Sequence, residues 1–593
     1  MRNSKLYEDL SILFKRSRSI LVLVIVIFLT LVVFLWKLQI LDYRKYLERS
    51  EANRIREVVV PAQRGLITDR DGRILAKNVA SFRVSFIREN CADIDESCLK
   101  ISRLLDLTPE QIRARIRKYE SIQSFKPVVI KGDLTAQEIA RIEAYKLEMP
   151  ELILQAEPKR EYPFTTFASH VLGYLQEISI EELRSGYLKK GGVENLIGKT
   201  GLEKQYEEML AGDEGRILHI VDSVGREKGI LFDQEPEPGE NIRLTIDYDL
   251  QSKAEDLLKG KEGVIILLSP KTGQVLCMAS YPGFDPNGFI RRFSPEEWND
   301  IIERKDFPLE NRAIRGLYSP GSIFKLTMAL TALDMQVVNE WTSFFCDGEV
   351  YIYGHPFSCW FEEGHGATNI FSSIQHSCNI YYYQLGRRID IEDIARYARE
   401  LGLGALTGID LPNEKSGLVP DRAWKKKSRN APWYPGETIS VSIGQGPVLV
   451  TPLQIACHTA ILANRGKKIT PHLLLSEDGQ EDFSLNIKAS LFEKVIKGMW
   501  QAVNSGGTAR AAHVDGSQIC GKTGSTQLVS RETAEKGDKT RKEYMTHSWF
   551  TGFAPRNDPK VVVTVIVEYG GMGGETAAPL AKEMFELFGK KYD

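Results

Sequence analysis

A serine and a lysine stand three residues apart in an otherwise apolar segment, residues 316–333, which reads GLYSPGSIFKLTMALTAL. Residues three apart share one face of a helix, so this spacing brings Ser322 and Lys325 together. Burial favours the neutral form of a lysine, and a neutral amine beside a hydroxyl can take its proton. The pair therefore predicts a serine nucleophile with a lysine as its general base.

Two further motifs follow in chain order and make the pair specific. Ser-x-x-Lys alone is a weak signal, because about two copies are expected by chance in a chain of this composition. Its alternative interpretation is a helix start with a lysine that reaches solvent. Ser377-Cys378-Asn379 and Lys522-Thr523-Gly524 then supply the Ser-x-Asn and Lys-Thr-Gly motifs, with Ser525 directly after. Ser319 has no lysine one turn further on.

Each of the other copies of these short motifs has a structural explanation that requires no catalytic role. Lys199-Thr200-Gly201 precedes a helical segment in which Thr200 and Glu203 predict a capping box. Lys271-Thr272-Gly273 falls in a hairpin turn, and Ser484-Leu485-Asn486 lies among polar loop residues. Only the Lys522 triplet lies on a candidate strand with small neighbours.

Four soft metal ligands gather within 33 residues: Cys346, Cys359, His365 and Cys378, with 12, 5 and 12 residues between them. Three cysteines and one histidine form a normal tetrahedral zinc set, with Asp347 as the alternative to Cys346. The competing interpretation is a packed histidine with core cysteines or a disulfide, which an oxidising compartment favours. If zinc binds, it would clamp the Ser-x-Asn segment, with the Cys378 side chain pointing away from the catalytic face.

Length and composition limit the function classes. A chain of 593 residues is too long for one hydrophobic core, which predicts at least two domains. A net charge of −2 gives no reason to expect nucleic-acid binding. Eight cysteines in this length do not form a disulfide scaffold. Cys91 and Cys98 are close enough in sequence for a disulfide, with two free thiols as the alternative.

An uncharged apolar run of 17 residues, Ile20 to Trp36, predicts a membrane anchor. Lys15, Arg16 and Arg18 precede it, which places the N-terminus in the cytoplasm by the positive-inside rule. The alternative is a cleaved signal peptide, but no small-x-small cleavage site follows. We expect a cytoplasmic tail at 1–18, a single transmembrane helix at 19–40 and a helix-prone juxtamembrane stalk at 41–60.

The remaining chain predicts two domains. Residues 61–245 combine β-rich pieces, with a hairpin turn at Asp71-Gly72, and a helical insertion at about 93–147, in which one helix begins at a Thr108 N-cap. The polar stretch 234–250 marks the boundary to a catalytic domain at 246–593. Strand candidates there flank a large helical region, which predicts one antiparallel sheet with helices on both faces. These candidates are GVIILLS, QVLCMASY, QICGKTGSTQL, HSWFTGFA and KVVVTVIVEY.

Together, the three motifs form the set found in penicillin-binding proteins and class A β-lactamases. The chain resembles class B penicillin-binding proteins along nearly its whole length, and within them the penicillin-binding protein 2 branch of cell elongation. The blocks that carry this resemblance are 64–78, 160–174, 197–215, 268–287, 439–456 and 547–555. It implies an α+β pedestal domain of the dimerisation type and an α/β transpeptidase domain with a five-stranded antiparallel sheet.

The resemblance also implies roles for the motif residues. Ser322 would attack the D-Ala-D-Ala carbonyl of a stem peptide and Lys325 would accept its proton. Ser377 would relay a proton to the leaving amine, while Asn379 would bind the substrate amide and orient the lysine. Lys522 would supply positive charge near the substrate carboxylate.

The residues after Lys522 complete the implied substrate site. The hydroxyls of Thr523 and Ser525 would lie near the carboxylate, with Gly524 between them. The backbone N–H groups of Ser322 and Ser525 would form the oxyanion hole. Many relatives have threonine where this chain has Ser525, which keeps a hydroxyl.

The resemblance implies partners as well. These are stem peptides of strands derived from lipid II, β-lactams, and a polytopic SEDS-type lipid-II polymerase with the elongation machinery, reached through the pedestal and the membrane helix. The chemistry requires no cofactor, so a zinc would be structural. The alternatives are a division-specific class B transpeptidase, a β-lactam-binding sensor or scaffold, and a β-lactamase or carboxypeptidase with water as acceptor.

Overall fold

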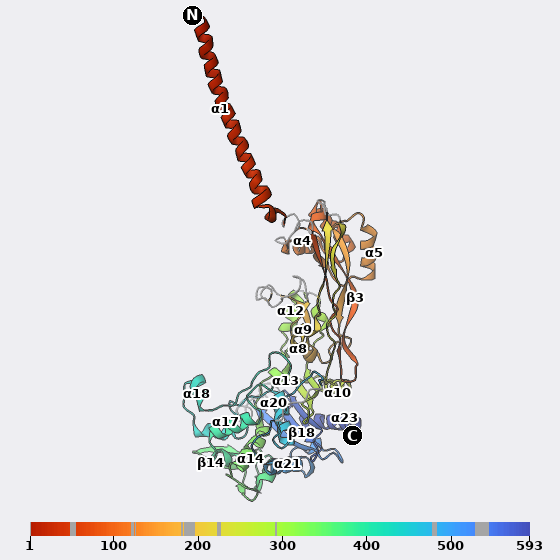
Figure 1. Cartoon of the computed structure of the whole chain (residues 1–593). Coiled ribbons are helices and arrows are strands. Elements are labelled where there is room, and N and C mark those ends of the chain that lie inside the picture. The colour runs from red at the N-terminus through yellow and green to blue at the C-terminus, as the bar shows by residue number, and fades with distance from the viewer. Residues whose placement is uncertain are drawn as a thin grey trace. The chain divides into compact units, whose positions relative to one another are not determined.

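A computed structural model gives the structure of the protein (Figure 1). It describes every residue except 1, 48–54, 120–123, 125, 179–181, 183–195, 222–226, 291, 292, 294, 477–482, 528–544 and 593. The chain divides into two compact units. The first comprises Met1–Ala62 and Asp213–Glu237, and the second comprises Gln63–Gly212 and Pro238–Asp593.

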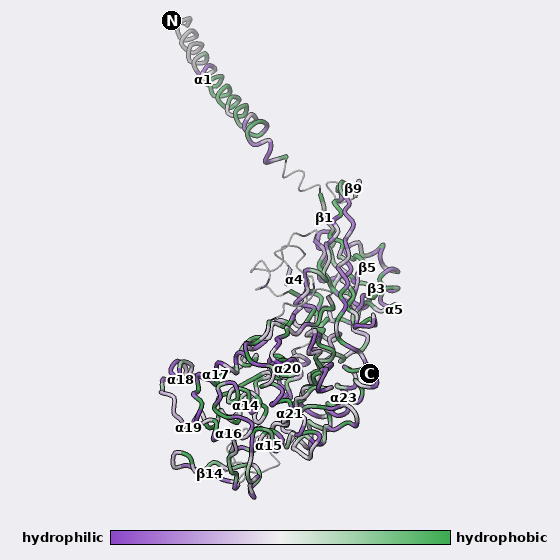
Figure 2. Tube along the Cα trace, turned by 60° about the horizontal axis from the view of Figure 1, so that its bottom comes forward, coloured by the Kyte–Doolittle hydropathy of each residue, from purple (hydrophilic) through white to green (hydrophobic). Residues whose placement is uncertain are grey.

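The first unit contains the predicted membrane anchor. Helix α1 (Arg2–Trp36) continues into one π-helical turn, η1 (Lys37–Leu41). The stretch Arg16–Leu41 has a mean hydropathy of 3.2 in its most apolar window, and Figure 2 shows the apolar colour along this part of α1. By length and composition it is the one helix among the described residues that could cross a membrane.

A three-stranded antiparallel sheet completes the first unit, in the order β1-β8-β9. Its strands are β1 (Ile55–Val60), β8 (Gly215–Val221) and β9 (Glu227–Gln234). The prediction of a stalk up to residue 60 was therefore wrong at its end. Residues 58–60 are three consecutive valines, whose branched side chains favour a strand. Residues 48–54 of the stalk lie outside the described residues.

The pedestal part of the second unit is built on a long antiparallel strand pair, β3 with β5. Strand β2 pairs with β3 across the predicted turn at Asp71-Gly72, and β10 pairs with β2 in parallel. The strands are β2 (Ile67–Thr68), β3 (Ile74–Phe86), β4 (Val128–Lys131), β5 (Leu152–Glu161), β6 (Leu175–Glu177), β7 (Leu196–Gly198) and β10 (Ile242–Arg243).

The helical insertion of the pedestal is interrupted by β4, which the helical period did not predict. The short alternating run Val128–Lys131 pairs with β3. Thr108 caps α4 in a capping box with Gln111, as the Thr-Pro start predicts. The pedestal helices are α3 (Ile94–Leu104), α4 (Pro109–Lys118), α5 (Ala136–Tyr145), α6 (Ser169–Leu172), α8 (Gly201–Gln205) and α9 (Glu207–Leu210).

Glu203 does not form the predicted capping box. Thr200 does stand at the N-cap of α8, but its side chain makes no capping bond. The Glu203 carboxylate is fully buried and accepts from Arg64 Nε at 2.6 Å, Arg160 Nε at 2.9 Å and Tyr162 Oη at 3.1 Å. Two guanidinium groups that are distant in sequence thus bind the carboxylate. The local pattern predicted that it would accept from the backbone N–H at the start of the helix.

The catalytic domain contains the predicted five-stranded antiparallel sheet, in the order β12-β11-β19-β18-β17. Its strands are β11 (Gly263–Leu268), β12 (Val275–Tyr281), β17 (Cys520–Gln527), β18 (Thr546–Ala554) and β19 (Val561–Val567). In β11, Val264 and Ile266 pack into one core while Ile265 and Leu267 pack into another. Because both faces are covered, the strand is apolar at every position.

Helices cover both faces of this sheet. Helix α20 (Pro452–Ala463) packs against β11, β18 and β19, and α23 (Ala577–Tyr592) packs with α10 (Tyr248–Leu258) on the other face (Figure 1). The other helices of the domain are α11 (Asn287–Ile290), α12 (Pro295–Ile302), α13 (Arg312–Arg315), η3 (Gly321–Ile323), α14 (Phe324–Asp334), α15 (Ile370–Gln375), α16 (Asn379–Gly386), α17 (Ile391–Glu400), α18 (Arg422–Arg429), α19 (Pro435–Val441), α21 (Ala489–Asn504) and η4 (Arg510–Ala512).

A small β subdomain lies between α14 and α15. Strand β13 (Phe344–Cys346) pairs with β16 (Gly366–Thr368), and the hairpin of β14 (Glu349–Ile352) and β15 (His355–Ser358) lies between them in the chain. This subdomain carries three of the four predicted zinc ligands.

Candidate active site and metal cluster

Ser322 lies in the 3₁₀ turn η3, directly before the buried helix α14. Gly321 has φ +53°, and its N–H donates to the Gly444 carbonyl at 3.0 Å. A Cβ at Gly321 would stand 2.5 Å from the Thr526 methyl group on β17. The turn therefore needs glycine both for its conformation and because it abuts the edge of the sheet.

Lys325 is fully buried one helical turn after Ser322. Its ammonium donates to the Ser377 carbonyl at 2.8 Å, to Ser377 Oγ at 3.3 Å and to Asn379 Oδ1 at 2.7 Å. In the part of the chain that the structure describes, no carboxylate pairs with it. Burial without an acidic partner lowers the pKa of Lys325 to about 8. The side chain is therefore poised to accept a proton near neutral pH.

The Ser-x-Asn motif lies between two helices. Helix α15 ends before His376, and α16 begins at Asn379. Ser377 has φ +54°, an uncommon conformation for a residue with a side chain. This turn directs the Ser377 hydroxyl and carbonyl at the same ammonium. The structure thus brings the first two predicted motifs together around Lys325.

The Lys-Thr-Gly motif lies on the edge strand β17, as predicted. A Cβ at Gly524 would lie 3.0 Å from the Pro320 carbonyl oxygen, so this strand runs directly beside the turn that carries Ser322. Thr523 Oγ1 donates to Thr508 Oγ1 at 3.0 Å, and Ser525 Oγ accepts from the Gly573 N–H at 3.0 Å. All three motifs therefore meet at one edge of the sheet.

Lys522 is also fully buried, and its ammonium donates to the Thr523 carbonyl at 3.0 Å. The pKa of Lys522 lies well below its ordinary value. Burial is the main cause, and the positive charge of Lys325 lowers it further. The charge on Lys325 therefore disfavours the charged form of Lys522. The resemblance implies a positive charge from Lys522 near the substrate carboxylate, and burial in this structure disfavours that charge.

Sequence reasoning missed three supporting residues: Gly444, Thr508 and Gly573. Gly444 has φ +72°, and a Cβ there would stand 2.1 Å from the Gly321 carbonyl oxygen. The sequence signal for it is the Gly-x-Gly at 444–446, within the block 439–456. Thr508 and Gly573 carry no local signal, because only folding places them beside β17.

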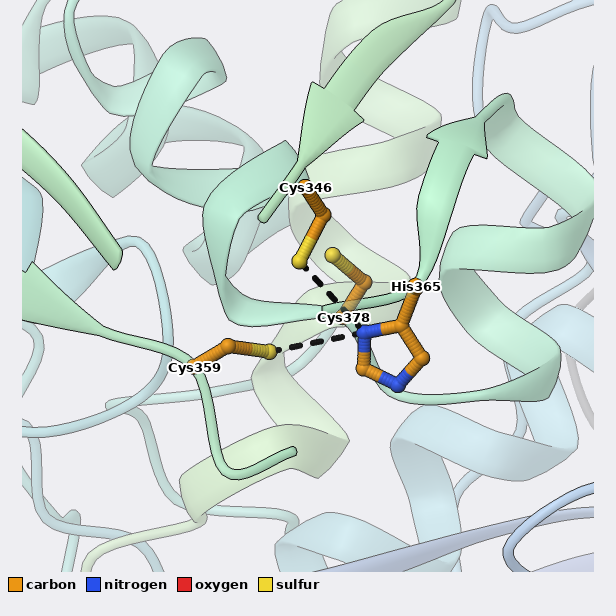
Figure 3. Close-up of side chains that lie close together, drawn as sticks. All are labelled: Cys346, Cys359, His365 and Cys378. Atoms are coloured by element: carbon orange, nitrogen blue, oxygen red, sulfur yellow. Dashed lines mark hydrogen bonds between the residues drawn. The ribbon is translucent and has the colours of Figure 1, made fainter. Parts of the chain in front are cut away.

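The predicted metal ligands form one cluster (Figure 3). The Sγ atoms of Cys346, Cys359 and Cys378 and a ring nitrogen of His365 all lie within 4.8 Å of one another. Asp347, the alternative to Cys346, is not a member of this group. The three thiols are free, so the alternative of a disulfide among these cysteines is not formed.

The geometry of the cluster fits zinc. Cys346 Sγ and Cys359 Sγ lie 3.6 and 3.5 Å from His365 Nδ1. A zinc tetrahedron with ordinary bond lengths places sulfur and nitrogen ligands about 3.6 Å apart. Hydrogen bonds from Cys378 and His365 lower the pKa of Cys359, which favours the thiolate that a metal requires.

The cluster is connected directly to the Ser-x-Asn motif. Cys378 stands between Ser377 and Asn379, and its side chain points into the cluster while its neighbours contact Lys325. The Asn379 N–H also donates to Cys359 Sγ at 3.4 Å. The remaining cysteines are not part of this group: Cys91 and Cys98 are free, and Cys277, Cys457 and Cys520 are buried core residues.

Two family descriptions match the chain. "Penicillin binding protein transpeptidase domain" covers residues 263–586, and "Penicillin-binding Protein dimerisation domain" covers residues 59–244. The first spans the five-stranded sheet and all three motifs. The second spans the pedestal strands of both units.

Curated relatives and solved structures match along most of the chain. The peptidoglycan D,D-transpeptidase MrdA of Acinetobacter baumannii is 34% identical, covering 93% of this chain and 84% of the relative. MrdA of Escherichia coli K12 is 32% identical, covering 96% and 93%. Penicillin-binding protein 2 from Helicobacter pylori, solved in complex with MreC, superposes with a TM-score of 0.82 at 29% identity, covering 91% and 99%. These matches and the convergence of the three motifs show that the chain belongs to the penicillin-binding protein 2 family of class B peptidoglycan D,D-transpeptidases.

Proposed function

We propose that Ser322 is the nucleophile of a peptidoglycan D,D-transpeptidase that works through a serine acyl-enzyme in cell-wall elongation. The observation that carries this proposal is the buried Lys325 ammonium, which is bonded to Ser377 and Asn379 and has a lowered pKa. A lysine in this state can act as the base that a serine hydroxyl requires.

The first step forms an ester. Ser322 Oγ attacks the carbonyl carbon of the penultimate D-Ala, and its proton passes to Lys325. The bond to the terminal D-Ala then breaks, and the proton returns through the Ser377 hydroxyl to the leaving amine. In the second step an amine of another stem peptide attacks the ester, which forms the cross-link and restores the serine hydroxyl.

The edge of β17 binds the substrate in this proposal. Lys522, with the hydroxyls of Thr523 and Ser525, meets the terminal carboxylate, and that anion favours the charged form of Lys522. The backbone N–H groups of Ser322 and Ser525 stabilise the oxyanion. The close approach of Gly524 to Pro320 supports this arrangement, because it brings both N–H groups to one edge.

We also propose that the cluster of Cys346, Cys359, His365 and Cys378 holds a structural zinc. When bound, the metal would supply no reaction step and would instead hold the segment between α15 and α16 in place. The support is the donor set, the match of its ligand separations to a tetrahedron, and the position of Cys378 between two catalytic residues.

The proposal extends to the membrane anchor and to the protein partners of this enzyme. We infer that α1 crosses the cytoplasmic membrane once, with the N-terminus in the cytoplasm and the catalytic domain outside. A related chain, 30% identical with a TM-score of 0.71, was solved within a peptidoglycan synthase complex. We infer a partnership with a SEDS-type lipid-II polymerase through the pedestal and α1, and inhibition by β-lactams.

Labelling with a fluorescent penicillin tests the nucleophile. Ser322→Ala should abolish labelling while the unfolding temperature stays unchanged, and Ser319→Ala is the matched control that should label normally. Mapping the labelled peptide identifies the modified residue. Label on another residue, or label retained by Ser322→Ala, would refute the assignment.

A further inference from the structure

The β14–β15 hairpin presents an aromatic face to solvent. Tyr351 is 70% exposed, while Ile352 beside it is buried. Tyr351 lies directly opposite Pro356, and Glu349 shares its outward face two positions away. This face therefore combines an aromatic ring, a proline ring and a carboxylate, with its apolar residues on the other side.

The tip of the hairpin carries a second exposed tyrosine in an unfavourable conformation. Tyr353 and Gly354 form the two-residue turn, with φ of +53° and +80°. Turns of this type favour Asn, Asp or Gly at the first position, so turn formation does not explain a tyrosine there. Tyr353 is 58% exposed. An exposed ring in a strained position indicates a role at the surface.

The base of the hairpin is bonded to the catalytic residues. The Ser358 carbonyl on β15 accepts from Asn379 Nδ2 at 3.3 Å, and Asn379 Oδ1 accepts from Lys325. Just beyond Ser358, the half-exposed Trp360 donates from Nε1 to the His376 carbonyl at 2.9 Å, directly before Ser377. The hairpin thus begins at the active site and extends away from it, with β14 at the periphery of the domain in Figures 1 and 2.

The length of the hairpin matches the reach of a stem peptide. From Glu349, opposite Ser358, to Tyr353 the strand advances about 13 Å. A stem peptide of four or five residues spans at most about 14–18 Å when extended. A strand whose stem reacts at Ser322 therefore has its sugar backbone within reach of the hairpin.

We propose that the outward face of the β14–β15 hairpin is a glycan subsite, where Tyr351 and Tyr353 stack on sugar rings of the strand whose stem peptide reacts at Ser322. Sugar rings offer apolar C–H faces to aromatic rings and hydroxyl groups to carboxylates such as Glu349. This inference rests on the proposed function, because it takes the peptidoglycan strand as the substrate.

The test measures binding of peptide-free glycan strands, prepared from peptidoglycan by amidase digestion, to the full-length protein in detergent. Tyr351→Ala should weaken the binding about tenfold, and adding Tyr353→Ala should weaken it further. Tyr351→Phe keeps the ring and should bind within about twofold of the wild type. Tyr145→Ala on α5, another half-exposed tyrosine, is the matched control and should bind normally.

Acylation by penicillin separates this inference from the proposed function. All the tyrosine variants should acylate at the wild-type rate, because none contacts Ser322, Lys325 or Ser377. Absence of saturable strand binding by the wild type, or wild-type binding by Tyr351→Ala, would overturn the glycan subsite. Normal strand binding with a loss of cross-linking only in membranes would also overturn it, in favour of a protein partner. Failure of the wild type to acylate would instead refute the proposed function.

Discussion

Raising the pH from 7 to 9 should accelerate acylation of Ser322 by penicillin about tenfold, because Lys325 must be neutral to accept the serine proton. Burial lowers its pKa to about 8. A lysine with a lowered pKa loses its proton at lower pH, so its neutral fraction is about 10% at pH 7, 50% at pH 8 and 90% at pH 9. The rate should follow this fraction and level off above pH 9.

Stopped-flow measurement of the acylation rate constant from pH 6 to 9.5 gives the apparent pKa directly. Lys325→Arg should reduce the rate by at least about a thousandfold at every pH, since a guanidinium does not release its proton in this range. Lys253→Arg, at a half-exposed lysine on α10 that pairs with Glu583, is the control and should leave the profile unchanged. A flat profile, a rate that falls with pH, or near-normal acylation by Lys325→Arg would refute the lysine as base.

Three further predictions concern other parts of the molecule. Protein purified without chelator should contain about one equivalent of zinc, and its removal or Cys378→Ala should slow acylation about ten- to a hundredfold; less than a tenth of an equivalent would contradict the zinc proposal. Glu203→Gln should destabilise the pedestal by about 3–5 kcal/mol in urea unfolding, because Arg160 stays buried without its counter-charge; a loss below about 1 kcal/mol would contradict this. Depletion in the host should yield rounded or widened cells, whereas long filaments would favour a role in division.

The catalytic sheet and its motifs could be predicted from the sequence because their signals are local. Runs such as VVVTVIV on β19 are apolar at six of seven positions, which is typical of a strand covered on both faces. Likewise, a lysine in the apolar helix α14 is costly to bury, which indicates that it has a chemical role. This cost of burial was the signal for Lys325, whereas Lys522 was identified by its motif on a candidate strand with small neighbours.

Other features could not be predicted because their partners come from distant parts of the chain. The pattern Thr200 to Glu203 fits a capping box, yet Arg64 and Arg160 lie far away in sequence and bind the carboxylate instead. A buried carboxylate gains more from two cations than from one backbone N–H, so tertiary structure overrides the local pattern. The β4 strand was missed for a similar reason, since its pairing with β3 decides a short segment that helices surround.

The segment from Ser377 to Asn379 shows how one short stretch connects three parts of the domain. Its first and third residues bind Lys325, its second residue enters the thiol cluster, and Asn379 also donates to the hairpin at Ser358. A displacement of the cluster or of the hairpin base must therefore move an atom bonded to Lys325. Because the hydrogen bond to Asn379 stabilises the ammonium, such a displacement would change the pKa of the base as well as its position. Zinc at the cluster and glycan at the hairpin would therefore both affect the proton transfer from Ser322 to Lys325, because each is connected to this segment.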